Sequence, residues 1–106
     1  MQQPTEWLYR IRPTRLAMLS EGPTQDEGEA MAAHFQYLKQ LTAEGTVILA
    51  GPTLVIDDSN FGVVIFNAPD RESAQAIMHA DPAVKGGVMH ADLFPFRVSL
   101  LTGRDS

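Results

Sequence analysis

One histidine lies within the apolar stripe of the first predicted helix, and its ring is suited to moving a proton. His34 follows an apolar residue by three positions and precedes two others by four and seven positions, which places all four side chains on one helix face. A titratable ring on such a face needs a polar partner, and a carboxylate is the usual one. The other prominent local signal downstream contains Asp81, directly before Pro82.

The expected helix lengths allow His34 and Asp81 to meet. A first helix of about 20 residues would be about 30 Å long and a second of about ten residues about 15 Å, at the standard rise per residue. His34 lies near the middle of the first, and Asp81 lies just past the end of the second. A carboxylate bonded to one ring nitrogen would fix the tautomer and leave the other nitrogen free to exchange a proton with a substrate. We therefore predict His34 as general base or acid and Asp81 as its orienting partner. A purely structural bridge, with Asp81 capping the turn at Pro82, remains an open alternative.

Three further residues are candidates for binding a substrate. Gly51 and Pro52 follow an apolar strand, where they serve either as a strand terminator or as a close backbone approach to a ligand. His90 alternates with Asp92 onto one face of the last predicted strand. That pair either lies near a pocket or belongs to a solvated surface or a dimer interface. No third ligand is placed beside it, so we predict no metal site.

Composition excludes several classes of function. The chain has no cysteine, and its three histidines share no chelating spacing, so we expect no metal. The sequence contains no glycine-rich phosphate loop or dinucleotide fingerprint, so we expect no cofactor. The net charge of −5 would repel nucleic acid. We find no transmembrane segment and no signal peptide, and we expect a soluble cytoplasmic protein without membrane contact.

Two nearby arginines allow two interpretations. Arg10 and Arg12 alternate onto one face of the first predicted strand. We favour a solvated strand edge for them. The alternative is an anion clamp for a small acidic substrate, since guanidinium binds carboxylates in a forked geometry.

Periodicity and turn residues predict six main elements. Thr24 and Glu27 form a capping box, and Gly45 is placed to end the first helix. Asp70 caps the second helix, which cannot pass Asp81 because the residue before a proline disfavours helical geometry. The expected order is a strand over 7–19 bent near its proline, a turn over 20–23, a helix over 24–44, a strand over 46–50, a loop over 57–60, a strand over 61–67, a helix over 70–81, a short turn over 82–85 and a strand over 88–100.

This order predicts an α+β fold of ferredoxin-like type. Right-handed crossovers in a βαββαβ chain place both helices on one face of a four-stranded antiparallel sheet. The second and third strands are apolar at both parities, so the other sheet face also needs cover. In a chain of 106 residues, a second copy is the simplest cover, and we expect a homodimer through the sheet.

The ordered motifs of the chain resemble the YciI-like (YCII-related) family over about residues 7–98. These motifs are His34-Phe-Gln-Tyr-Leu-Lys39-Gln-Leu, Gly45, Leu49-Ala50-Gly51-Pro52, Ala80-Asp81-Pro82-Ala83-Val84, Gly87 and the strand end Pro95-Phe96. The resemblance implies one domain over 1–106, a dimeric α+β barrel and an active-site pair at His34 and Asp81. Some members resemble small enzymes that eliminate a halide from a ring or isomerise by moving protons. Met89-His90 departs from the pattern and alters the expected pocket lining.

Two classes of function follow from these observations. The first is a small cofactor-independent lyase or isomerase, in which a dyad of His34 and Asp81 transfers protons on a small organic molecule. Acyl transfer fits less well, because no serine or cysteine nucleophile has a recognisable setting. The alternative is a non-catalytic metabolite-binding or accessory dimeric module that uses the same pocket.

Overall fold

Four strands form one antiparallel sheet in the computed structural model, which describes residues 4–103. The strands are β1 (Glu6–Pro13), β2 (Val47–Pro52), β3 (Gly62–Asn67) and β4 (Met89–Phe96). Their order across the sheet is β2-β3-β1-β4, so β1 pairs with both β3 and β4. This is the ferredoxin-like order, and it confirms the α+β fold predicted from the sequence.

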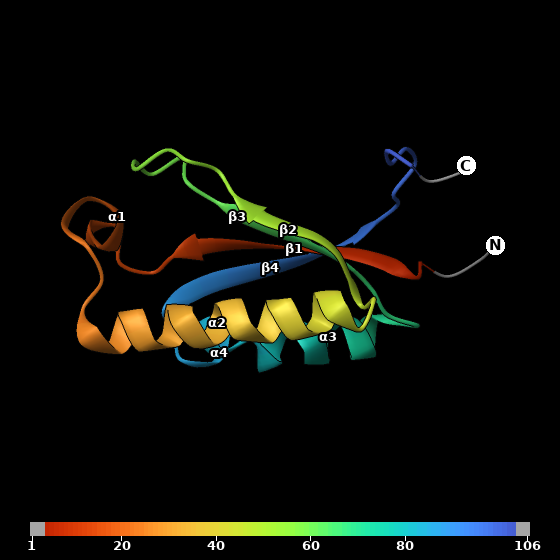
Figure 1. Cartoon of the computed structure of the whole chain (residues 1–106), viewed down its shortest axis with the longest axis horizontal. Coiled ribbons are helices and arrows are strands. Elements are labelled where there is room, and N and C mark those ends of the chain that lie inside the picture. Colours follow the sequence, from red (N-terminus) through yellow and green to blue (C-terminus); the bar gives the residue numbers. More distant parts are fainter. Residues whose placement is uncertain (1–3, 104–106) are drawn as a thin grey trace.

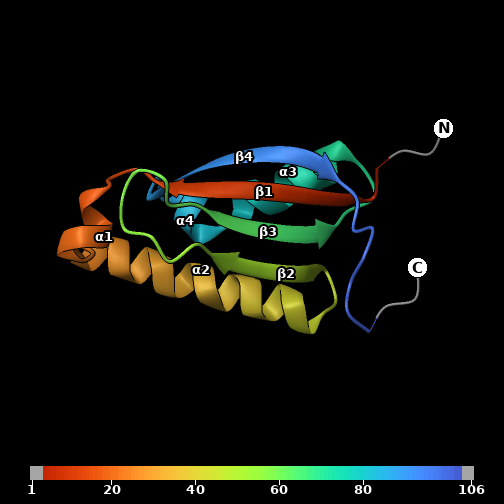
Figure 2. The same cartoon turned by 90° about the horizontal axis from the view of Figure 1, so that it is seen from above.

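The longer helices cover one face of this sheet. Figure 1 shows α2 (Gln25–Ala43), α3 (Arg71–Ala80) and the short α4 (Pro82–Lys85) on the same side of the strands. Viewed from above, α2 runs along the β2 edge, and α3 lies behind β1 and β4 (Figure 2). Both crossovers that carry these helices start from one face, as the right-handed rule requires.

Local signals in the sequence set the helix ends. The hydroxyl of Thr24 accepts a hydrogen bond from the Glu27 backbone, and the Glu27 carboxylate accepts one from the Thr24 backbone. Gly45 follows α2 with a φ of +83°, a conformation that glycine adopts without steric cost. Asp70 caps α3 through the Ser73 backbone amide at 2.8 Å. These features confirm the predicted capping box and both predicted helices.

The hydrophobic core lies between the helices and the covered sheet face. Alternate residues of β1 and β3 point into it, and Trp7, Tyr9, Val64 and Phe66 are each at most 2% exposed. The register sets Trp7 opposite Phe66 and Tyr9 opposite Val64. The core therefore holds one tyrosine hydroxyl among apolar side chains, and that hydroxyl needs a buried acceptor.

Several predicted elements have other bounds in the structure. The first strand ends at Pro13 instead of residue 19, and a short helix, α1 (Ala17–Glu21), includes part of the expected turn. Proline cannot donate to a sheet ladder, so the strand stops where that residue falls. The last strand ends at Phe96 instead of residue 100. The turn expected over 82–85 is the helix α4, and β2 extends through Pro52.

The placement of the arginines also differs from the prediction. Because β1 lies between β3 and β4, Arg10 and Arg12 are on a central strand rather than at an edge. Both lie on the sheet face that the helices leave uncovered, in register with Asp92 and His90 of β4. Their guanidinium groups approach the Asp92 carboxylate at 3.0 and 3.7 Å. The arginines thus form ion pairs within one chain.

Candidate active site

A fully buried carboxylate joins three elements that are distant in the sequence. Asp81 has no exposed surface, and its backbone is extended because Pro82 follows it. One carboxylate oxygen accepts a hydrogen bond from the Ala83 backbone amide at 3.0 Å, which caps α4. The other accepts one from the hydroxyl of Tyr9 on β1 at 2.7 Å. Asp81 therefore ties the turn before α4 to the central strand.

The third partner of Asp81 is the ring of His34. Its Nδ1 lies 2.8 Å from both carboxylate oxygens, and His34 is 9% exposed. α2 brings the ring to this position because it contacts both α4 and β2. The structure thus brings His34 and Asp81 together, 47 positions apart in the chain.

Hydrogen bonding fixes the protons around this pair. Burial, followed by the negative charge of Asp81, raises the pKa of Tyr9 above its usual range, so the hydroxyl keeps its proton and donates it. The amide of Ala83 can act as a donor alone. The Tyr9 hydroxyl and the Ala83 amide thus both donate to Asp81 as a carboxylate. A carboxylate can only accept, so the third partner, Nδ1 of His34, must donate to it as well. In the neutral ring, Nδ1 of His34 is then protonated and Nε2 is the basic nitrogen.

His34 forms part of the wall of a cavity of about 860 Å³ between α2 and the strands β2 and β3. The other lining side chains are mainly apolar, with Ile11 of β1 and Met89 of β4 at one end. The polar side chains in the lining are His34, Lys39, Thr42 and Asn60. A ligand here would meet a mainly apolar surface together with these four polar side chains. Such a setting suits an organic molecule with an apolar body.

Two of the predicted binding residues line the same cavity as His34. Gly51 and Pro52 form part of its wall at the end of β2. A Cβ built on Gly51 would meet no atom within 4 Å, so a larger residue would fit there, and no close packing requires glycine. Gly51 and Pro52 as ligand-binding residues stay a prediction.

His90 lies elsewhere. It is exposed and stands opposite Arg12 in the register of β4, on the uncovered face of the sheet, and it does not line the cavity beside His34. The pairing of His90 with Asp92 on one face is as the alternation predicted. A role for His90 in binding a substrate stays a prediction, and within this protomer it is not beside His34.

The contact of Tyr9 with Asp81 was not predicted. Alternation along β1 marks Trp7, Tyr9 and Ile11 as one buried face, and a tyrosine on such a face needs an acceptor. That signal indicates a buried polar partner without identifying it. The identity of the partner depends on where the turn after α3 folds, which no local pattern specifies.

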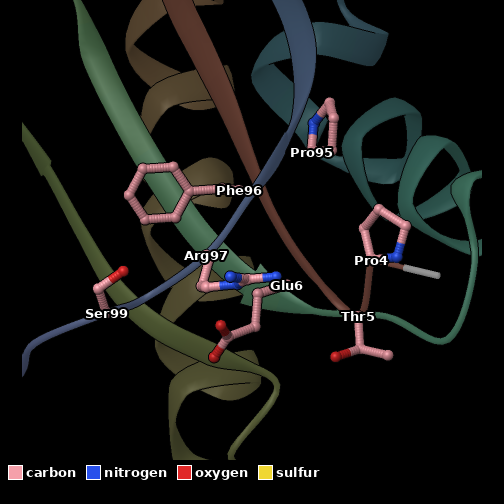
Figure 3. Close-up of a pocket in the computed structure, with 7 residues that line it drawn as sticks. All are labelled: Pro4, Thr5, Glu6, Pro95, Phe96, Arg97 and Ser99. Carbon is pink, nitrogen blue, oxygen red and sulfur yellow. The ribbon is translucent and has the colours of Figure 1, made fainter. Parts of the chain in front are cut away.

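A second hollow lies at the opposite end of the sheet, where β1 begins and β4 ends (Figure 3). It has a volume of about 550 Å³, and Glu6 and Arg97 are its charged lining residues. The Glu6 carboxylate accepts a hydrogen bond from the backbone amide of Val98 at 2.9 Å, which holds the segment after β4 against β1. None of the predicted site residues lines this hollow.

Two further observations concern residues 4–103. Within that range, no cluster of three or more histidine, aspartate or glutamate side chains is arranged to hold a metal ion. No helix in the same range is long and apolar enough to cross a membrane.

Comparison with known proteins gives a family match over most of the chain. The family model described as the YCII-related domain matches residues 8–97. An uncharacterised protein of Bacillus subtilis (strain 168), YjpA, is 36% identical over 59 residues. That alignment covers 56% of this chain and 66% of YjpA, slightly less than two thirds of its length.

A solved structure shares the fold. The 5-chloro-2-hydroxyhydroquinone dehydrochlorinase TftG of Burkholderia phenoliruptrix AC1100, in complex with 2,5-dihydroxybenzoquinone, superposes with a TM-score of 0.60. The match covers 86% of this chain and 93% of that one, at 22% sequence identity. At this identity, the likeness establishes the fold.

Proposed function

We propose that this chain, which belongs to the YCII-related domain family, is a small cofactor-independent enzyme that transfers protons on an organic molecule bound beside His34. We propose further that residues 1–106 act as a single domain. The observation that carries the proposal is a buried ring whose Nδ1 is fixed by Asp81 while the residue forms part of the wall of a mainly apolar cavity. This arrangement leaves Nε2 as the nitrogen available to a ligand.

In the proposed reaction, Nε2 of His34 takes a proton from a carbon atom of the substrate. The electron pair of the broken C–H bond then forms a double bond as an anion leaves the neighbouring carbon, which is the lyase outcome. In the isomerase outcome, the same proton returns to a different atom of the substrate. In both, the imidazolium that forms is stabilised by the Asp81 carboxylate 2.8 Å from Nδ1.

The cavity lining supports an apolar substrate that carries an acidic group. Lys39 is the cation in a lining that contains no carboxylate. Lys39 and His34 both reach this lining from α2. The ligand of the structural neighbour TftG, a dihydroxybenzoquinone, is a ring that carries acidic hydroxyl groups. Gly51 and Pro52 would contact the apolar body, and His90 stays a candidate binding residue.

We also propose that two copies associate through the uncovered sheet faces. Phe94 and Phe96 are 42% and 39% exposed in the single chain. Phe94 and Phe96 lie on the same face of β4 as Asp92, opposite the helices. A second copy laid on this face would bury these aromatic side chains. The helices would then remain on the outside of the pair.

Proton exchange into a panel of probe compounds tests the proposed chemistry. The protein is incubated in D₂O with small acidic carbonyl and phenolic compounds, and NMR follows the replacement of carbon-bound hydrogen by deuterium and any loss of a leaving group. Binding of 2,5-dihydroxybenzoquinone is measured in parallel. We expect catalysed exchange or elimination with at least one compound, lost in His34→Gln and retained in His79→Gln, whose histidine is exposed at the end of α3.

Two outcomes would overturn the enzyme proposal. If 2,5-dihydroxybenzoquinone binds but no compound of the panel exchanges a carbon-bound hydrogen or loses a leaving group, the cavity belongs to a binding module. If His34→Gln behaves as the wild type in both measurements, His34 has no part in the site.

A further inference from the structure

We propose that Tyr9 is a positioning residue that keeps Asp81 as a carboxylate and the shared proton on Nδ1 of His34, so that the imidazolium formed when Nε2 takes up a proton is stabilised. The inference rests on the proposed function for its catalytic meaning. The placement of the proton is nevertheless a property of the folded protein and can be measured without a substrate. Tyr9 would act through Asp81 and would not touch the substrate itself.

The position of the Tyr9 hydroxyl is fixed from several sides. Tyr9 is fully buried on the central strand, opposite Val64 of β3 and Leu93 of β4. Its ring meets that of Phe66 edge to face, with centroids 5.6 Å apart. A side chain held in this way loses little additional freedom when its hydroxyl donates to Asp81 at 2.7 Å. The hydroxyl is therefore a preorganised donor.

Two arrangements of protons are available once the pair holds a second proton. In one, Asp81 is a carboxylate and both ring nitrogens of His34 are protonated. In the other, the Nδ1 proton has moved to Asp81, and the neutral ring carries its proton on Nε2. Both arrangements follow proton uptake at Nε2, and only the first keeps an imidazolium beside a charged carboxylate. Hydrogen-bond donors favour the carboxylate, because a bond to a charged acceptor is stronger than one to a neutral acid.

Tyr9 supplies one of the two donors to Asp81 other than His34. The second is the Ala83 amide at 3.0 Å, which belongs to the backbone and stays in any side-chain variant. Removing the Tyr9 hydroxyl therefore removes one of these two donors. Oδ2 of Asp81, which accepted from that hydroxyl at 2.7 Å, is then left with His34 as its partner. The difference between a charge-assisted and a neutral hydrogen bond corresponds to about a tenfold change in the equilibrium ratio of the two proton arrangements, in favour of the one in which Asp81 is an acid.

Tyr37 provides a matched control. It follows His34 by three residues on α2, and its hydroxyl donates to the Ile77 carbonyl at 2.7 Å. Tyr37→Phe deletes the same group as Tyr9→Phe, at a similar distance from its acceptor, but leaves the hydrogen bonds of Asp81 intact. Any effect of merely losing a tyrosine hydroxyl will appear in both variants.

The experiment is ¹⁵N NMR of the His34 ring in the wild type, Tyr9→Phe and Tyr37→Phe, recorded from slightly acidic to slightly alkaline pH. In the wild type and Tyr37→Phe, we expect Nδ1 to carry a proton in each ring form that is observed. In Tyr9→Phe, we expect about tenfold more of the reversed form, with Nε2 protonated and Nδ1 unprotonated. A buried tyrosine that only fills space would not move this pattern.

An unchanged ratio of the two ring forms in a folded Tyr9→Phe protein would overturn the proposal. Should that variant fail to fold, 3-fluorotyrosine in the Tyr37→Phe background keeps the test open, because the chain has two tyrosines and the label then sits at position 9 alone. The fluorinated hydroxyl is a stronger donor, so the reversed form should decrease, and an increase would contradict us. A reversed ring pattern without any activity in the exchange assay would leave the role of Tyr9 standing and refute the proposed function.

Discussion

Replacing Asp81 should reveal how much of the stability depends on one carboxylate. Asp81→Ala leaves three donors without an acceptor: the Tyr9 hydroxyl, the Ala83 amide and Nδ1–H of His34. The ring of His34 can move its proton to Nε2 and so avoid leaving Nδ1–H without an acceptor. The other two donors belong to residues with no exposed surface and cannot reach water in the folded state.

The magnitude follows from those two donors. Each buried, unsatisfied donor costs about 1–3 kcal/mol, so Asp81→Ala should lower the free energy of unfolding by about 2–6 kcal/mol. Asp81→Asn keeps one oxygen as acceptor for the Ala83 amide, but its NH₂ group cannot accept from the Tyr9 hydroxyl. It leaves one buried donor unsatisfied instead of two and should lose about 1–3 kcal/mol. A domain of this size has about 5–15 kcal/mol in total, so both losses are measurable.

Urea unfolding followed by the fluorescence of Trp7, the single tryptophan, measures these losses. Trp7 is 2% exposed and reports on the core directly. Asp70→Ala is the control, because Asp70 also caps a helix through a backbone amide at 2.8 Å but is exposed, and it should lose about 1 kcal/mol. The reasoning fails if Asp81→Ala is no less stable than Asp81→Asn. It also fails if Asp81→Asn exceeds the wild type, because burial of the charge would then outweigh its hydrogen bonds.

Three further changes test other parts of the molecule. Hydrogen bonds from Arg15, and next from the Thr24 backbone, lower the pKa of Glu27 from 4.5 to about 2, so the stabilisation they give is complete above pH 4.5 and is lost as the pH falls through about 2. Arg15→Gln should therefore lower the free energy of unfolding in urea at neutral pH but not near pH 2. An equal loss of unfolding free energy at the two pH values would contradict this. Phe94→Asp on the uncovered sheet face should yield a monomer in light scattering at micromolar concentration, whereas a dimer of unchanged mass would exclude association through this face. Gly62→Ala would place a Cβ 3.0 Å from Cγ1 of Ile11 and should lower the free energy of unfolding by about 1–3 kcal/mol, and an unchanged urea midpoint would show that Ile11 moves aside freely.

Features that depend on neighbouring residues were predicted well from the sequence. The capping box at Thr24 and Glu27, the end of α2 at Gly45 and the stop of α3 before Pro82 are each set within a few residues. The element order then leaves few topologies, because crossovers are right-handed. This is why the sheet order could be predicted before any contact was known.

Features that depend on tertiary contacts were harder to predict. The sequence indicated that His34 needed a polar partner and offered Asp81, and the distance between them agrees. The third member, Tyr9, comes from a strand 72 positions from Asp81, and its hydroxyl appeared as one more core residue. The position of Arg10 on a central strand could not be inferred from alternation, because alternation specifies the face of a strand and not its neighbours.

The length of chain between the partners of Asp81 also bears on how the protein folds. The hydrogen bonds of Asp81 span 72 positions to β1 and 47 positions to α2. Contacts of such separation form late, because the intervening chain must be ordered before they close. A partly folded chain can hold either helix or a strand pair, but it cannot hold the ring of His34 in its final tautomer. The ability to handle a proton should therefore arise together with the last step of folding, so that an immature or truncated chain is chemically silent.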